Sequence, residues 1–115
     1  MDILTNQKEV CTKYKSPFVE APRNLKIGVS INVKDGTYPI NGMRHRPENG
    51  TAGWYIWAGD QFSNDPDFFI PLHVAHLSEW CPAILKYLGL APGWRFLIGN
   101  NSYEDVWEDK SLLEV

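Results

Sequence analysis

The segment that most constrains the fold is 53–58, which places three large aromatic residues within four positions. Side chains alternate between the two faces of a strand, so Trp54 and Ile56 share one face. Tyr55 and Trp57 share the other. A segment that is apolar on both faces is typical of a strand covered on both sides. We therefore expect a central strand here, unless a partner covers one face.

An acidic turn follows this segment directly. Asp60 opens the turn. Asp65 and Asp67 flank a proline, just before Phe68. Rigid aromatic area next to charge is typical of recognition surfaces. Because alternation predicts that the aromatic strand is mainly core, we expect the contact surface to lie in this turn, between Asp60 and Asp67.

Other segments alternate apolar and polar residues. Residues 25–33 have an apolar residue at every second position, which predicts a strand with one wet face. Residues 94–98 and 103–108 alternate as well, and the Asn-Asn pair between them tolerates a tight turn, so we expect an antiparallel hairpin. Residues 37–52, with their Asn-Gly pairs, are predicted to be turns and loop.

The best helical pattern covers residues 71–89. Apolar positions recur there at spacings of three and four, at Val74, Leu77, Cys81, Ile84 and Leu88. Gly89 is well placed to end the helix in a left-handed conformation. Pro82 lacks the N–H that would bond back one turn, so we expect a kink or a break near Cys81.

These elements predict the α+β class, with a small antiparallel sheet of about four or more strands packed with one main, kinked helix. A length of 115 residues fits one domain. We expect residues 1–24 to form an N-terminal lead-in segment, in which a short helix is an alternative, and residues 25–115 to form the domain. Because the chain has neither eighteen consecutive apolar residues nor a basic-then-apolar N-terminus, we expect it to be cytoplasmic.

Charge is shared unevenly along the chain. Residues 1–50 carry eight Lys and Arg against five Asp and Glu, whereas residues 51–115 carry three against nine. An acidic field repels nucleic acid and anionic lipid, and it attracts basic partners. We therefore expect no nucleic-acid or membrane partner, and either a basic partner or a simply solvated acidic face.

Motifs for catalysis are absent from the sequence. It has no GxSxG, GxGxxG or P-loop pattern, so we predict no catalytic residue. His73 and His76 with Cys81 could begin a metal site, but the spacing is not HExxH and no fourth ligand follows at a regular spacing. The acids of residues 60–67 lack the order of a calcium loop. We expect no metal and no cofactor.

Arg44, His45 and Arg46 form a basic run within the predicted loop. Such a run can grip an anion, but it is more commonly solvated. An alternative function uses the same residues: a small-ligand-binding module, in which the aromatic strand and this loop line a pocket.

Several groups of residues together resemble a bacterial immunity protein family, the one numbered thirty-three. They are residues 35–42, residues 53–59 with Asp65, Pro66 and Asp67, residues 88–90 with 93–96, and residues 103–107. The resemblance runs from about Gly28 to Val115. It implies a cytosolic antidote of polymorphic toxin systems, which binds a cognate toxin and blocks it, and it carries no catalytic residues.

An antidote of this kind binds through aromatic anchors and through charge complementary to the toxin's active site. If the toxin is a nuclease, acidic side chains would occupy its basic substrate groove. We expect the toxin-facing surface to be acidic and anchored by aromatic residues. The residues expected to contact the toxin are Asp60, Asp65, Asp67, Phe68, Glu104, Asp105, Trp57 and Trp107.

Overall fold

The computed structural model describes residues 3–48, 50–59, 68–101 and 103–114, and six strands of these residues form one sheet. The strands are β1 (Lys26–Val29), β2 (Ile40–Arg44), β3 (Thr51–Ala58), β4 (Ile70–His73), β5 (Trp94–Ile98) and β6 (Glu104–Glu108). Their order is β4-β1-β3-β2-β5-β6, with β1 and β3 parallel and every other neighbouring pair antiparallel. This mixed sheet, together with short helices, confirms the α+β class.

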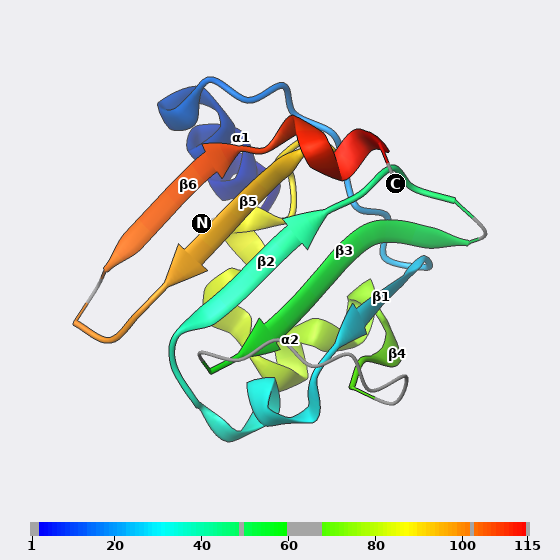
Figure 1. Cartoon of the computed structure of the whole chain (residues 1–115), viewed down its shortest axis with the longest axis vertical. Coiled ribbons are helices and arrows are strands. Elements are labelled where there is room, and N and C mark those ends of the chain that lie inside the picture. Colours follow the sequence, from blue (N-terminus) through cyan, green and yellow to red (C-terminus); the bar gives the residue numbers. More distant parts are fainter. Residues whose placement is uncertain (1–2, 49, 60–67, 102, 115) are drawn as a thin grey trace.

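Helical segments cover one face of the sheet. They include the α-helices α1 (Ile3–Tyr14) and α2 (Leu77–Trp80) and the 3-10 segment η3 (Pro82–Tyr87). The other 3-10 segments are η1 (Ile31–Asp35), η2 (Val74–His76) and η4 (Lys110–Glu114), and η4 lies at the end of β2 and β3. Figure 1 shows α1, α2 and η3 behind the sheet. Val10 of α1 and Ile84 of η3 join the core formed with the buried strand residues. Among the described residues, no helix lies across the face turned toward the viewer.

β3 is central in the sheet, as its sequence predicts. It pairs with β1 on one side and with β2 on the other. Trp54 and Ile56 are buried in the core, and the indole N–H of Trp54 donates a hydrogen bond to the Leu88 carbonyl at 3.0 Å. Tyr55, which points to the other face, is half-buried. The side chains on one face of β3 therefore pack against the helical layer, and those on its other face point to the side of the sheet without helices.

The strand predicted for 25–33 ends early, with β1. Beyond it, Ser30 and Asn32 bind the end of β3 through their side chains. Ser30 Oγ accepts a hydrogen bond from the Ala58 N–H at 3.2 Å, and Asn32 Nδ2 donates to the Ala58 carbonyl at 2.9 Å. Such bonds compete with a regular ladder. The chain bends into η1, and Ile31, an apolar position of the predicted strand, is 66% exposed.

The loop prediction for 37–52 is wrong where β2 forms. β2 lies between β3 and β5 in the interior of the sheet. Its Gly42 signals a turn in the sequence, but in the fold it makes space, since a Cβ there would lie 2.2 Å from the ring of Phe96. In the sequence, a glycine that is needed for close packing therefore looks the same as a glycine that is needed for a turn.

The helix predicted for 71–89 forms only in part. Ile70–His73 makes the strand β4, and the helical residues divide into η2, α2 and η3. The break falls at Cys81, directly before the proline, as the missing proline N–H predicts. Gly89 is not left-handed; its Cβ would lie 2.7 Å from the ring of Phe18. The longest helix of the described residues is α1, in the segment expected to be a lead-in.

The hairpin predicted for 94–98 and 103–108 is confirmed. β5 and β6 pair antiparallel, from Trp94 opposite Glu108 to Ile98 opposite Glu104. Asn101 adopts φ 62°, the left-handed conformation that asparagine tolerates.

Arg44 is buried, with 1% of its surface exposed. Its guanidinium contacts main-chain carbonyl oxygens of three separate segments: those of Ala52 (2.9 Å), Val19 (2.6 Å), Glu20 (3.1 Å), Leu88 (3.3 Å) and Leu90 (2.7 Å). Burial lowers the pKa of Arg44 to about 10, so the side chain stays protonated at neutral pH. Both roles considered for it from the sequence, anion binding and solvation in a loop, are therefore wrong.

Replacing Arg44 with methionine should destabilise the fold by about 3–5 kcal/mol, because buried carbonyl groups lose a charged donor at once. Arg44→Lys should be intermediate, since an ammonium offers three donors where a guanidinium offers five. Urea unfolding measures both effects. Arg46→Met is the matched control, because Arg46 is exposed two positions away. Equal stability of the Arg44→Met and Arg46→Met variants would contradict the role given to Arg44.

Candidate functional site

Alternate residues of β2, β3, β5 and β6 point away from the helices and form a surface that we call the helix-free face. Cross-strand pairing arranges them in two rows, with Tyr55, Met43, Arg95 and Trp107 in one and Trp57, Asn41, Leu97 and Asp105 in the other. Trp57 is buried, Asp105 is exposed, and the other six are half-buried. The face thus combines aromatic, apolar and charged side chains.

One end of the helix-free face is an aromatic cluster. The ring of Phe69 lies 5.3 Å from that of Tyr55, 6.3 Å from that of Trp57 and 4.9 Å from that of Phe68, all edge to face. His45 contacts Tyr55 in the same way at 5.4 Å. Edge-to-face rings attract each other through their quadrupoles. Trp57, only 6% exposed, therefore acts mainly as packing for this cluster.

Trp107 dominates the other end of the face. The Arg95 guanidinium lies 5.5 Å from the centre of its ring, within cation–π range. Arg95 Nη1 also pairs with Asp109 at 3.3 Å, which holds the guanidinium over the ring. Asp105, two positions before Trp107 in β6, is exposed on the same face. A fixed aromatic stack therefore lies beside an exposed carboxylate.

A hollow of about 580 Å³ opens where the β2–β3 end of this face meets η4. Its lining includes side chains of both charges and an aromatic ring, among them Met43, His45, Arg46, Glu48, Tyr55 and Glu114. His45 Nδ1 lies 3.1 Å from the Leu112 carbonyl, which fixes the imidazole at the rim. The sequence suggested a ligand pocket lined by the aromatic strand and the loop of residues 44–46. Tyr55, His45 and Arg46 of these segments do line the hollow, whereas Trp54 and Arg44 are buried in the core.

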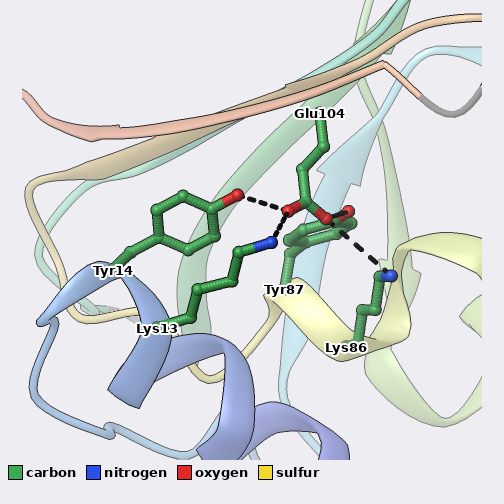
Figure 2. A network of polar contacts seen from close by, with 5 residues as sticks. All are labelled: Lys13, Tyr14, Lys86, Tyr87 and Glu104. Carbon is green, nitrogen blue, oxygen red and sulfur yellow. Dashed lines mark hydrogen bonds and ion pairs between the residues drawn. The ribbon is translucent and has the colours of Figure 1, made fainter.

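Glu104 begins β6 but points to the opposite side, toward the helices (Figure 2). Its carboxylate accepts hydrogen bonds from the hydroxyl groups of Tyr14 and Tyr87, and it pairs with Lys13 at 3.1 Å and with Lys86 at 3.8 Å. Two of these partners come from α1 and two from η3. One carboxylate therefore ties the edge of the sheet to both helical segments.

The electrostatics of this network favour the charged carboxylate. Burial alone would raise the pKa of Glu104, but hydrogen bonds from Tyr14, Tyr87 and Lys13 outweigh it and lower the pKa to about 2. Burial, followed by the neighbouring carboxylate, raises the pKa of both tyrosines. At neutral pH the glutamate is ionised, the tyrosines are protonated, and the carboxylate is engaged within the protein.

The residues predicted to contact a toxin fall in different places. Trp57, Asp105 and Trp107 lie on the helix-free face, and Phe68 packs beside it in the aromatic cluster. Glu104 is the neighbour of Asp105 but faces the helices. Asp60, Asp65 and Asp67 of the acidic turn lie outside the described residues.

Met43 and Arg95 are among the residues of this face that sequence reasoning missed. Met43 was hidden in a predicted loop, although the alternation of residues 40–44 was a signal for a strand. Arg95 was seen in a strand, but its contact with Trp107 depends on the register of the hairpin. That register follows from a turn near Asn101, so this pair could have been found.

His73 and His76 form a small polar cluster of their own. Their rings lie 6.1 Å apart, and His76 Nδ1 lies 3.0 Å from Glu79, while His73 is exposed. In the part of the chain that the structure describes, no three His, Cys, Asp or Glu side chains gather as metal ligands would. Within the same residues, no helix has the length and apolar content needed to cross a bilayer.

Comparison with known proteins connects this chain to one family. The model of the Imm33-like domain matches residues 6–109, which includes most of α1 and all six strands of the sheet. No curated protein and no solved structure matched the chain. The match begins well before Gly28, where the resemblance read from the sequence starts.

The Glu104 network should make stability depend on pH in acid. The pKa of Glu104 falls from 4.5 to about 2 on folding, so its contribution is present above pH 4.5 and is lost as pH falls toward 2. Between pH 6 and pH 3 the wild type should lose about 2 kcal/mol more unfolding free energy than Glu104→Gln. Urea unfolding at each pH measures this difference. Glu9→Gln, on the exposed side of α1, is the control, and parallel pH profiles for wild type and Glu104→Gln would contradict the network.

Proposed function

The chain belongs to the Imm33-like domain family, and on that basis we propose that it is an immunity protein, which binds a cognate toxin domain and thereby blocks it. The observation that carries this proposal is the family match over residues 6–109. Such a protein acts by occupying the toxin, so it requires a binding surface and no catalytic group of its own.

The helix-free face supports this proposal as the contact surface, centred on Trp107 and Asp105. Hot spots of protein interfaces are enriched in tryptophan, tyrosine and arginine, and Tyr55, Arg95 and Trp107 all lie on this face. Arg95 stacks on Trp107 in the unbound protein, so the anchor is already ordered before binding. Preorganisation of this kind lowers the entropy lost in a complex.

The two predicted contact residues that lie inside the fold take supporting roles in this proposal. Trp57 packs under Phe69 and steadies the aromatic cluster, and the Glu104 carboxylate holds β6 against the helices. Asp60, Asp65 and Asp67 remain proposed contacts on the basis of the sequence. Together with the exposed Asp105 they would present acid to a basic toxin surface.

A rescue experiment tests the function itself. The toxin domain to use is the variable C-terminal domain of a large secreted protein encoded next to this gene. Cells that express the domain alone should stop growing, and cells that also express this chain should grow. Growth arrest despite abundant, folded chain would refute the proposal.

Substitutions on the helix-free face test the surface. Trp107→Ala should weaken binding of the inactivated toxin domain by about 30-fold, as the loss of a hot-spot anchor does. Asp105→Ala should weaken it by about 10-fold through the lost charge. Isothermal titration calorimetry measures the affinities, and thermal unfolding checks each fold. Glu9→Ala, which removes an exposed carboxylate from α1, should bind normally. Wild-type affinity in both test variants would place the contact elsewhere.

A further inference from the structure

The two edge strands of the sheet, β4 and β6, differ in what their backbones offer to a partner. Each edge strand hydrogen-bonds to one neighbour, and every second residue points its N–H and C=O outward. Natural sheets usually obstruct such edges, because an unpaired edge accepts another strand. Figure 1 shows β6 at one border of the sheet and β4 at the other.

The outward positions of β6 follow from its hydrogen bonds to the neighbouring strand. The Asp109 N–H donates to the Gly93 carbonyl at 2.6 Å, and the Gly99 N–H donates to the Tyr103 carbonyl at 3.0 Å. Because bonded and non-bonded pairs alternate in an antiparallel ladder, Asp105 and Trp107 also bond inward. The N–H and C=O groups that point outward therefore belong to Glu104, Val106 and Glu108. Among the described residues, no backbone group pairs with them.

β4 lacks this property. The Val74 N–H donates to the Leu25 carbonyl at 2.9 Å, so the alternation makes Pro71 and His73 the outward residues of the strand. Proline has no N–H, which removes one donor from a four-residue edge. β4 is obstructed in the usual way, whereas β6 keeps a donor at each outward position.

Charge limits which strand β6 can accept. The Glu104 carboxylate is engaged by its tyrosine and lysine partners, but Asp105 and Glu108 are exposed, and no described residue forms an ion pair with either. In an antiparallel pairing of two copies about Val106, Glu104 of one copy would face Glu108 of the other. Like charges directly opposite each other destabilise a sheet. The edge therefore disfavours self-association and favours a basic strand.

We propose that β6 accepts an extended, Lys- or Arg-bearing segment of the toxin as a seventh strand of the sheet. The outward groups of Glu104, Val106 and Glu108 would form the ladder, and Asp105 and Glu108 would pair with basic side chains on its two sides. Strand addition of this kind takes its affinity from main-chain hydrogen bonds and its specificity from side chains. This inference rests on the proposed function, and it names how the toxin is held.

Amide hydrogen exchange, measured by NMR on this chain alone and with the inactivated toxin domain, tests the proposal. The N–H groups of Glu104, Val106 and Glu108 should exchange quickly in the free protein and at least about 10-fold more slowly in the complex. Those of Asp105 and Trp107 bond inward in both states and serve as internal references. A complex in which the three outward amides exchange as fast as in the free protein would overturn the strand addition and leave the proposed function intact.

A pair of substitutions at one position provides the second measurement. Glu108→Pro removes an outward N–H and keeps the inward ladder, whereas Glu108→Ala removes only the carboxylate. Glu108→Pro should bind the toxin domain at least about 10-fold more weakly than Glu108→Ala, and equal affinities would oppose the proposal. If Glu108→Pro does not fold, the exchange measurement decides. Absence of any complex with the wild-type chain would refute the proposed function and this inference with it.

Discussion

The burial of Arg44 is the constraint on which the rest of the structure depends. A guanidinium taken out of water without a carboxylate partner is costly unless its donors are satisfied. Here main-chain carbonyl groups of three segments satisfy them, and the ring of Trp54 lies 5.7 Å from the guanidinium carbon. The segment after α1, the start of β3 and the turn after η3 must therefore meet at one point. That meeting places the helices on a single face of the sheet.

Because the helices pack on one side of the sheet, the two faces of the sheet have different roles. On the helix side, polar and aromatic groups are used for cohesion, as in the contacts of Glu104 with Tyr14 and Tyr87 (Figure 2). On the helix-free face, the rings of Tyr55 and Trp107 remain half-exposed, and contacts such as that of Arg95 with Trp107 order them. Residue type alone does not separate these roles.

β6 joins the two proposals because it belongs to both the face and the edge. The side chains of Asp105 and Trp107 lie on the helix-free face, while the outward backbone groups of the residues between and beside them lie on the edge. A toxin segment added to β6 would extend the sheet and bring the rest of the toxin against the aromatic stack. Because the Glu104 carboxylate ties β6 to the helical layer, this edge is held in place before any partner binds.

The sequence by itself determined the elements whose signal is local: the central aromatic strand, the hairpin of β5 and β6, the break at Cys81 and the family resemblance. It misread β2, because Gly42 makes room for Phe96 and only the neighbouring strand reveals that need. The roles of Arg44 and Glu104 were decided by tertiary structure alone, since their partners lie up to 91 residues away in the chain. Periodicity records which side of an element faces the core, and it contains no information about which distant group will be there. Glu104 and Asp105 are therefore alike in sequence and opposite in the fold.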